Sequence, residues 1–146
     1  MNVRSAEPHD FDAVTALLAD LGRTPVTDET RDRCREIYAA QISDPTADHL
    51  VAVNDEGEVV GFCSLHFRKR LNYTRPEAWI PDLIVAAERR RTGIGKALLE
   101  HAEQRAIERG CWALSLESAY HRVEAHRFYG AFGMRDAAKA FHKLLS

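Results

Sequence analysis

The sequence predicts one α/β domain of the α+β kind, with a mixed and mostly antiparallel sheet of about six to seven strands flanked by four helices. Three observations predict this fold. The chain has 146 residues, which suits a single hydrophobic core. Apolar residues recur at helical spacing near both ends of the chain. Between those segments lie β-rich runs separated by turn residues.

The first third of the chain predicts one strand and two helices. Asn2–Ser5 has the pattern of a short strand. Pro8 suits the first turn of a helix, because its missing N–H is not needed there. This helix runs to about Gly22, since apolar residues recur at helical spacing: Phe11, Val14, Leu17, Leu18 and Leu21. A second helix carries its own apolar stripe: Cys34, Ile37, Tyr38 and Ile42.

The middle of the chain predicts strands. Leu50–Val53 and Val59–Phe67 are β-rich runs joined by a polar hairpin sequence. A third run, Ala78–Val85, contains Pro81. Because proline cannot donate to a sheet ladder, we expect this strand to be bulged or unpaired on one side at that point.

The last third predicts two more helices and two strands. A strong helix is expected from Gly93 to about Arg109, followed by a strand at Trp112–Glu117. Val123–Phe132 predicts a helix, because apolar residues recur there at i, i+3, i+4 and i+7. Ala138–Leu145 predicts a final strand. Its outer edge, at Ala140–Leu145, would be open to a second copy of the chain.

The composition excludes several classes of protein. The chain has 20 Lys+Arg and 22 Asp+Glu, a net charge of −2, which argues against nucleic acid as the main partner. No apolar run approaches the roughly 20 residues of a membrane span, and the N-terminus lacks a signal-peptide pattern. Cys34, Cys63 and Cys111 are too far apart for a zinc motif and indicate reduced thiols. We therefore expect a cytoplasmic protein with no nucleic-acid or membrane partner and no bound metal.

The segment Arg90–Lys96, with the sequence RRTGIGK, stands between a predicted strand and a predicted helix. Glycines at a helix start bare backbone N–H groups at its positive end, which is a site for phosphate. A solvated basic turn is the alternative. A Walker A loop is excluded, because it needs Ser or Thr where Ala97 stands and Gly where Arg90 stands. A dinucleotide fingerprint starting at Gly93 is excluded because it needs a small residue where Leu98 stands.

These residues, with a second motif, resemble the GNAT superfamily of acyl-CoA N-acetyltransferases. The family's Arg/Gln-x-x-Gly-x-Gly/Ala motif is matched by Arg90–Gly95, after a strand ending in Leu83–Val85. An aromatic helix that ends in Tyr and is followed by Gly-Phe/Met is matched by Phe128–Met134. The resemblance covers nearly the whole chain. It implies that residues 1–146 form a single N-acetyltransferase domain, an acyltransferase that uses acetyl-CoA.

The resemblance also implies where acetyl-CoA binds. The pyrophosphate would sit on Arg90–Lys96, and the pantetheine would pair with the backbone of Leu83–Val85. The central strand would splay at Pro81 to admit it. A backbone N–H near Ile84 or Val85 would take the thioester oxygen. Tyr129 would protonate the departing thiolate as general acid. The cofactor-binding residues so implied are Leu83, Ile84, Val85, Arg90, Arg91, Thr92, Gly93, Ile94, Gly95, Lys96, Arg122, Ala125 and Phe128.

A closer resemblance concerns the acceptor. His121–Tyr129 and Leu65–Phe67 are similar to the corresponding segments of aminoalkylphosphonate N-acetyltransferases, which implies a small-molecule primary amine as substrate. Arg122 stands where the wider superfamily often has Asn, which separates the chain from common peptide N-terminal acetyltransferases. Protein, peptide and aminoglycoside acetyltransferases remain alternatives, as does a non-catalytic acyl-CoA-binding module. The family also suggests a homodimer.

An aliphatic ammonium must lose a proton before it attacks, which calls for a carboxylate near the thioester. Asp82, on the bulged strand, is the first candidate. Glu117 is the second, with Ser118 beside it as a substrate-binding candidate. A salt-bridged carboxylate at a strand end is the plainer interpretation of each acid. His66 is a candidate for contact with the acceptor or a divalent ion. The basic run Arg68–Arg70 is either a solvated hairpin end or an anchor for an anionic acceptor.

Overall fold

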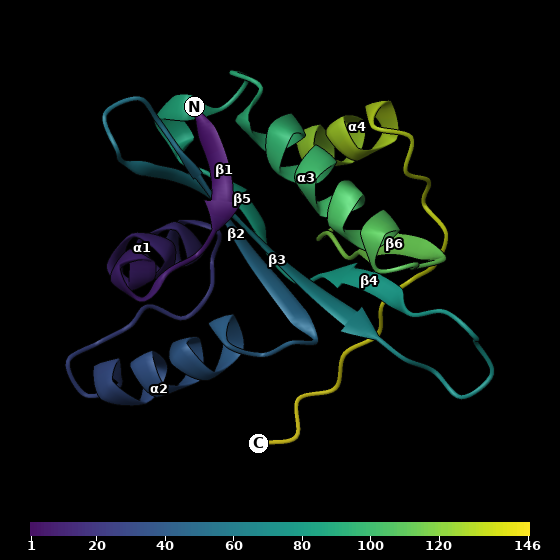
Figure 1. The fold of residues 1–146 in the computed structure, drawn as a ribbon, viewed down its shortest axis with the longest axis horizontal. Coiled ribbons are helices and arrows are strands. Elements are labelled where there is room, and N and C mark those ends of the chain that lie inside the picture. Colours follow the sequence, from purple (N-terminus) through teal and green to yellow (C-terminus); the bar gives the residue numbers. More distant parts are fainter. The chain divides into compact units, whose positions relative to one another are not determined.

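The computed structural model describes the whole sequence, residues 1–146, as two compact units, residues 1–115 and 116–146. A six-stranded sheet has the order β1-β2-β3-β4-β6, and β5 pairs with β3 off this path. The strands, drawn in Figure 1, are β1 (Asn2–Ser5), β2 (Ala47–Val53), β3 (Val59–Arg68), β4 (Glu77–Ile80), β5 (Leu83–Val85) and β6 (Ala113–Leu116). The pairings among β1 to β5 are all antiparallel.

Four α-helices and two short 3-10 turns connect or follow the strands, which confirms the predicted helices. They are η1 (Pro8–Asp10), α1 (Phe11–Asp20), α2 (Arg31–Ile42), η2 (Ala87–Arg89), α3 (Ile94–Glu108) and α4 (Val123–Ala131). Pro8 opens the first turn, as expected from its missing N–H. Gly110, with φ 71°, follows the end of α3 in the left-handed conformation that stops a helix.

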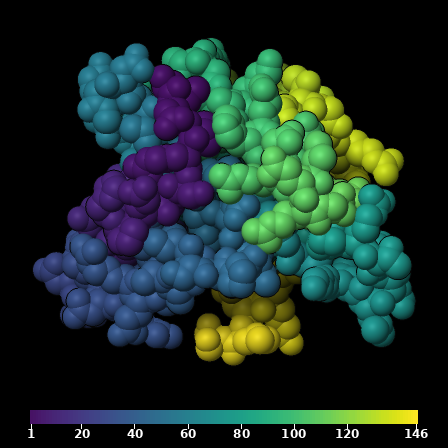
Figure 2. Space-filling view, viewed as in Figure 1, coloured from purple at the N-terminus to yellow at the C-terminus, as the bar shows by residue number.

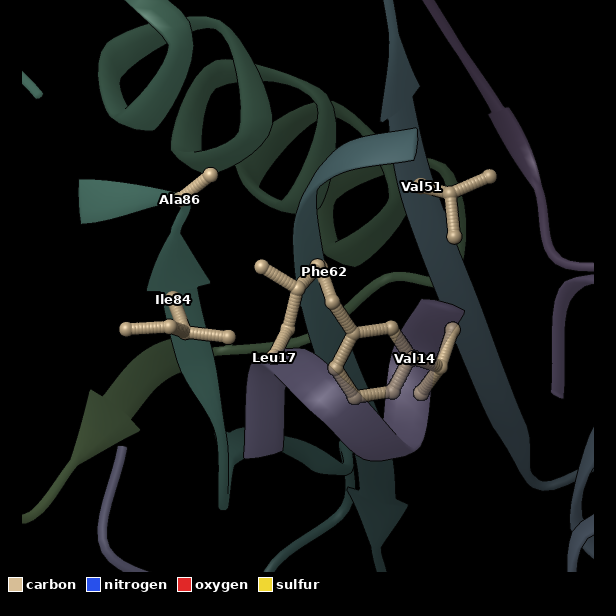
Figure 3. Close-up of a cluster of buried hydrophobic side chains, with 6 residues drawn as sticks. All are labelled: Val14, Leu17, Val51, Phe62, Ile84 and Ala86. Carbon is tan, nitrogen blue, oxygen red and sulfur yellow. The ribbon is translucent and has the colours of Figure 1, made fainter. Parts of the chain in front are cut away.

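The first unit has helices on both faces of its sheet. One face meets α1 through a buried cluster, shown in Figure 3: Val14, Leu17, Val51, Phe62, Ile84 and Ala86. The other face meets α3 so closely that a Cβ built on Gly61 would lie 2.9 Å from the side chain of Leu98. Because strand side chains alternate between faces, residues 62, 64 and 66 of β3 all point to the α1 side.

The predicted central strand is split. Ala78–Val85 forms two strands, β4 and β5, separated by Pro81 and Asp82. β4 pairs with the end of β3 and with β6, whereas β5 pairs only with residues 61–63 of β3. The expectation of a splayed strand at Pro81 is therefore confirmed. Its consequence is that one edge of β5 carries no neighbouring strand.

The segment between β3 and β4 projects from the first unit and is the teal loop at the right of Figure 1 and Figure 2. The ring of Tyr73 in this segment stacks on Trp112 with centroids 5.1 Å apart. The amide of Trp112 also donates to the carbonyl of Pro76 at 3.0 Å. These contacts tie the projecting segment to the start of β6.

The prediction of a final strand at Ala138–Leu145 is wrong. Residues 134–146 have no regular secondary structure. Phe141, Leu144 and Leu145 are exposed by 89%, 89% and 90%. An apolar run becomes a strand only when another strand pairs with its backbone, and the pattern alone cannot supply that partner. The open strand edge expected at Ala140–Leu145 for a second copy is therefore absent as well.

Candidate functional site

The loop between β5 and α3 has the geometry of an anion site. Gly93 is the N-cap of α3 and has φ 87° and ψ 0°, in the left-handed region that favours glycine. No side chain caps the helix, and no acidic residue stands in its first turn. The amides of Ile94, Gly95 and Lys96 therefore lack partners within the helix. The positive end of the helix dipole adds to their attraction for phosphate.

Cationic side chains surround this loop. Arg90 and Arg91 are exposed, and Arg89, which precedes them in the sequence, is half-buried. Arg91 has φ 65°, which is uncommon for a residue other than glycine. The hydroxyl of Thr92 donates to the carbonyl of Arg89 and closes the turn. The side chain of Lys96 is 70% exposed, so its charge faces solvent. Its Nζ lies 4.0 Å from Glu100 Oε1. The predicted phosphate-binding residues thus lie together.

The backbone of β5 offers one open edge. Backbone hydrogen bonds between residues 86 and 60 (2.8 Å) and between residues 64 and 82 (3.0 Å) flank the pair Ile84–Phe62. Hydrogen-bonded pairs alternate along an antiparallel ladder, so Ile84 directs its N–H and C=O at Phe62. Leu83 and Val85 direct theirs away from β3. Of the two amides expected near the thioester oxygen, that of Val85 is the one on the open edge.

Asp82 lies in the break between β4 and β5, and both of its carboxylate oxygens are engaged. Oδ1 accepts from Arg23 Nε at 2.8 Å, and Arg23 also donates to the carbonyl of Pro81 at 3.0 Å. Oδ2 accepts from the hydroxyl of Ser64 at 3.3 Å, and the amide of Asp82 donates to that hydroxyl at 3.1 Å. The Arg23 side chain is 53% exposed and that of Asp82 20%. Arg23 was not predicted from the sequence, because it lies 59 positions from Asp82.

A row of rings continues from Ser64 along the α1 side of the sheet. His66 follows Ser64 by two residues on β3 and so shares its face. Its ring centroid lies 5.9 Å from that of Trp79 on β4 and 5.7 Å from that of His49 on β2, both in edge-to-face contact. His49 also stacks on Phe62 at 6.1 Å. The row therefore crosses three adjacent strands.

His49 is a residue that the sequence analysis missed, because the strand expected from Leu50 begins at Ala47. The side chain is buried, and neither of its ring nitrogens has a hydrogen-bond partner in the protein. The indole nitrogen of Trp79 is in the same situation. Burial lowers the pKa of His49, and the neighbouring His66 lowers it further. Buried polar atoms normally have partners, and a bound water commonly supplies one where the protein does not.

The basic run at the end of β3 is partly paired. Arg68 forms an ion pair with Glu77 and lies over the ring of Trp79, 4.6 Å from its centroid. Arg70 lies over Tyr73 at 4.9 Å. An open depression in the surface here is lined by Arg68, Lys69, Arg70 and Glu77. The positive charges of Arg68, Lys69 and Arg70 at this hairpin end exceed the single negative charge of Glu77.

The second unit carries the residue expected to act as general acid. Its helix α4 follows Arg122 and has no fully buried residue. The ring of Tyr129 lies 5.5 Å from that of Phe128. Glu117 is exposed, whereas the hydroxyl of Ser118 is buried without a hydrogen-bond partner in the protein. The half-buried residues of this helix and its cap are Arg122, Ala125, Phe128 and Tyr129.

Residues 11–134 match the model of the acetyltransferase (GNAT) family, so the chain belongs to this family. The anion loop at the start of α3 and the split strand before it agree with the family's use of acetyl-CoA. The protein is therefore a GNAT N-acetyltransferase that uses acetyl-CoA, and the resemblance inferred from the sequence is confirmed.

The chain is similar to several individual proteins. The chain is 32% identical over 143 residues to an aminoalkylphosphonate N-acetyltransferase of Salmonella typhimurium, covering 98% of this chain and 90% of that one. It is 30% identical to an aminoglycoside N(6')-acetyltransferase type 1 of Klebsiella aerogenes, covering 94% and 91%. A solved structure described as a transcriptional regulator from Bacillus halodurans has a TM-score of 0.90 at 26% identity, with 99% of both chains covered. None of the helices is both long and apolar enough to cross a membrane.

Proposed function

We propose that residues 1–146 act as one domain that transfers the acetyl group of acetyl-CoA to the primary amine of a small molecule. We further propose an aminoalkylphosphonate, or an amine of similar size, as the acceptor. The observation that carries this is the similarity to the Salmonella enzyme, which extends over 98% of the chain and so includes the helices α1 and α2. The basic depression at Arg68–Arg70 supports an acceptor that bears an anionic group.

Acetyl-CoA would be held by backbone more than by side chains. Its pyrophosphate would accept hydrogen bonds from the amides at the start of α3, with Arg90, Arg91 and Lys96 supplying charge. Its pantetheine would pair with the open edge of β5. The amide of Val85 would then donate to the thioester oxygen as negative charge develops on it.

The reaction is a direct attack. The free amine adds to the thioester carbonyl carbon, the C–S bond breaks, and Tyr129 gives a proton to the departing thiolate. The products are the acetamide and the thiol of coenzyme A, and one proton is released for each ammonium consumed. Asp82, the first candidate to take the ammonium proton, is the proposed carboxylate on the acceptor side, where its charge would also attract the ammonium. Glu117 is the second candidate for this role.

Binding of acetyl-CoA is the first test. A ligand that binds only the native state stabilises it by about 2.7 kcal/mol at a concentration of 100 Kd, so acetyl-CoA should raise the unfolding temperature. The double variant Arg90→Glu and Lys96→Glu should lose most of this rise. Differential scanning fluorimetry measures both, and an unfolding temperature of the unaltered protein that does not respond to acetyl-CoA contradicts the proposal.

The role of Tyr129 is tested by Tyr129→Phe. Loss of a general acid should lower kcat about 10²-fold or more, because the thiolate must leave unprotonated. The affinity for acetyl-CoA should change little, since no contact with the pyrophosphate is removed. Tyr120→Phe is the matched control, because Tyr120 is 82% exposed. Equal kcat values in the two variants would show that Tyr129 is not the acid.

The aminoglycoside alternative has its own support in the Klebsiella relative. An aminoglycoside is polycationic and would be repelled by the Arg68–Arg70 surface. A panel of amines assayed for released thiol decides between the two acceptors. Turnover of 2-aminoethylphosphonate above that of kanamycin supports the proposal, and the reverse order replaces it. Acetyl-CoA binding without turnover of any amine would indicate a non-catalytic acyl-CoA-binding module.

A further inference from the structure

We propose that His66 accepts the proton of the acceptor ammonium, and that His49, buried behind it, is a positioning residue that holds the His66 ring for this transfer. This inference rests on the proposed function and deepens it, because it concerns how the acceptor is activated.

The position of His66 suits contact with an acceptor. Asp82 contacts Ser64 at the point where the central strand splits. His66 lies two residues further along β3 on the same face, which corresponds to about 7 Å. An acceptor drawn to the break between β4 and β5 would therefore have the His66 ring beside it. His66 is half-buried and lies on the face of the sheet that faces α1.

Asp82 is less well placed to receive the proton itself. One carboxylate oxygen accepts from the Arg23 guanidinium at 2.8 Å, and the other accepts from the Ser64 hydroxyl at 3.3 Å. Protonation of either oxygen requires one of these contacts to break. The arrangement is better suited to keeping a fixed negative charge near the acceptor. A neutral imidazole, in contrast, has one nitrogen ready to accept a proton without losing a partner.

His49 has the features of a support for His66. Its ring is held between Phe62, on which it stacks, and the edge of His66. Its exposed fraction is 6%, so no acceptor can reach it directly. Both ring nitrogens lack protein partners, although a neutral histidine has one donor and one acceptor to satisfy. A water shared with His66 would satisfy one of them, since buried polar sites commonly hold such waters.

The surroundings of His49 disfavour a proton on that ring. The titratable groups that act on His49 are His66 on β3, Asp48 on β2, Asp82 at the strand break, and Asp44 after α2. Burial lowers the pKa of His49, so this ring stays neutral, and its neutrality leaves His66 free of a like charge.

The proton transfer balances simply. The acceptor ammonium gives its proton to a ring nitrogen of His66, which yields the free amine and an imidazolium. The amine attacks the thioester, and the departing thiolate takes its proton from Tyr129. The tetrahedral ammonium nitrogen loses a second proton as the amide forms, which restores Tyr129. His66 finally releases its proton to solvent, so one proton leaves per turnover.

The test is the pH profile of kcat/KM for 2-aminoethylphosphonate at saturating acetyl-CoA. The unaltered protein should lose activity toward acidic pH, the acidic limb of the profile, because the group that accepts the ammonium proton is then already protonated. His66→Gln should lose this limb and lower kcat/KM about 10²-fold or more. His49→Phe, which keeps the stacking on Phe62, should shift the midpoint and cost roughly tenfold. His142→Gln, on the exposed C-terminal segment, should change neither.

Two results overturn the proposal. The first is a His66→Gln variant that keeps the acidic limb and stays within about threefold of the normal rate. The second is loss of the limb in Asp82→Asn but not in His66→Gln, which would make the carboxylate the base. Raised KM with a retained limb in Asp82→Asn agrees with a role in attraction alone.

A second measurement needs no turnover. Nitrogen NMR of the histidine rings should show that His49→Phe alters the tautomer or titration of His66 while acetyl-CoA still raises the unfolding temperature. An unchanged His66 signal overturns the positioning role of His49. If acetyl-CoA binds but no amine is acetylated, the proposed function fails, and this NMR comparison still decides whether His49 orients His66.

Discussion

Asp10 and His49 are both buried in the first unit, but of the two only Asp10 has protein partners for the polar atoms of its side chain. Its carboxylate accepts two hydrogen bonds from Arg4, at 2.7 and 3.0 Å, and one from the amide of Glu7 at 2.8 Å. This satisfied pair ties β1 to the start of α1 and needs no further explanation. The ring nitrogens of His49, in contrast, have no hydrogen-bond partner in the protein and can therefore bind a water or a reacting group.

The Asp10–Arg4 pair should matter for stability. Asp10→Ala leaves the Arg4 guanidinium without its partner in a partly buried place, which should lower the free energy of unfolding by about 3 kcal/mol. Asp12→Ala is the matched control, since Asp12 pairs with Arg31 at 71% side-chain exposure and should cost less than about 1 kcal/mol. Urea unfolding measures both, and equal losses would contradict the distinction.

The same pair predicts a pH dependence. Burial raises the pKa of Asp10, but the hydrogen bonds from Arg4 and the Glu7 amide outweigh burial and hold the pKa below its usual 3.8. A carboxylate with a depressed folded-state pKa contributes stability that is present above about pH 4 and lost as the pH falls through the folded value. The stability difference between the unaltered protein and Asp10→Ala should therefore shrink from pH 6 to pH 3. A constant difference would contradict this.

At the scale of elements, the close packing of α3 on β3 places the anion loop over β5. Gly61 pairs with Val85 and faces α3, and a Cβ there would meet the Leu98 side chain at 2.9 Å and that of Ile94 at 3.1 Å. Gly61→Ala should therefore push α3 outward and cost about 1–3 kcal/mol. It should also weaken acetyl-CoA binding, because the helix start and the open strand edge move apart.

Gly130→Ala is the matched control for Gly61→Ala, since nothing lies within 4 Å of a Cβ built on this helical glycine. An alanine there should stabilise α4 by about 0.5–1 kcal/mol. Thermal unfolding with and without acetyl-CoA compares the two variants. A Gly61→Ala protein with normal stability and normal ligand response would show that α3 adjusts without cost.

At the scale of the whole molecule, the sequence predicted those features that depend on residues close together in the chain. The apolar stripe of α1, the break at Pro81 and the glycine at the start of α3 each follow from residues close in the sequence. The partnership of Arg23 with Asp82 and the meeting of His49 with His66 depend on strand register and on loop paths, which local periodicity does not encode. The final strand failed for the same reason, because the pattern at Ala138–Leu145 cannot supply a pairing partner.

The irregular C-terminal segment predicts a pattern of proteolysis. Proteases cleave exposed backbone that is free of regular secondary structure. Trypsin should therefore cut after Arg135, Lys139 and Lys143 before it cuts within α1 to α3, and mass spectrometry of early digests would show this. Early cleavage inside α3, with residues 134–146 intact, would contradict the exposed placement of this segment.

The open edge of β5 has a consequence for how such a protein changes over generations. Every residue except proline has a peptide N–H whatever its side chain, so a point mutation at Leu83 or Val85 would rarely remove a backbone contact of the proposed donor site. The proposed acceptor side consists of side chains, such as His66 and Trp79, which single mutations replace readily. Point mutations could therefore change the acceptor while the donor is retained. Two relatives of similar identity are named for a phosphonate in one case and for an aminoglycoside in the other.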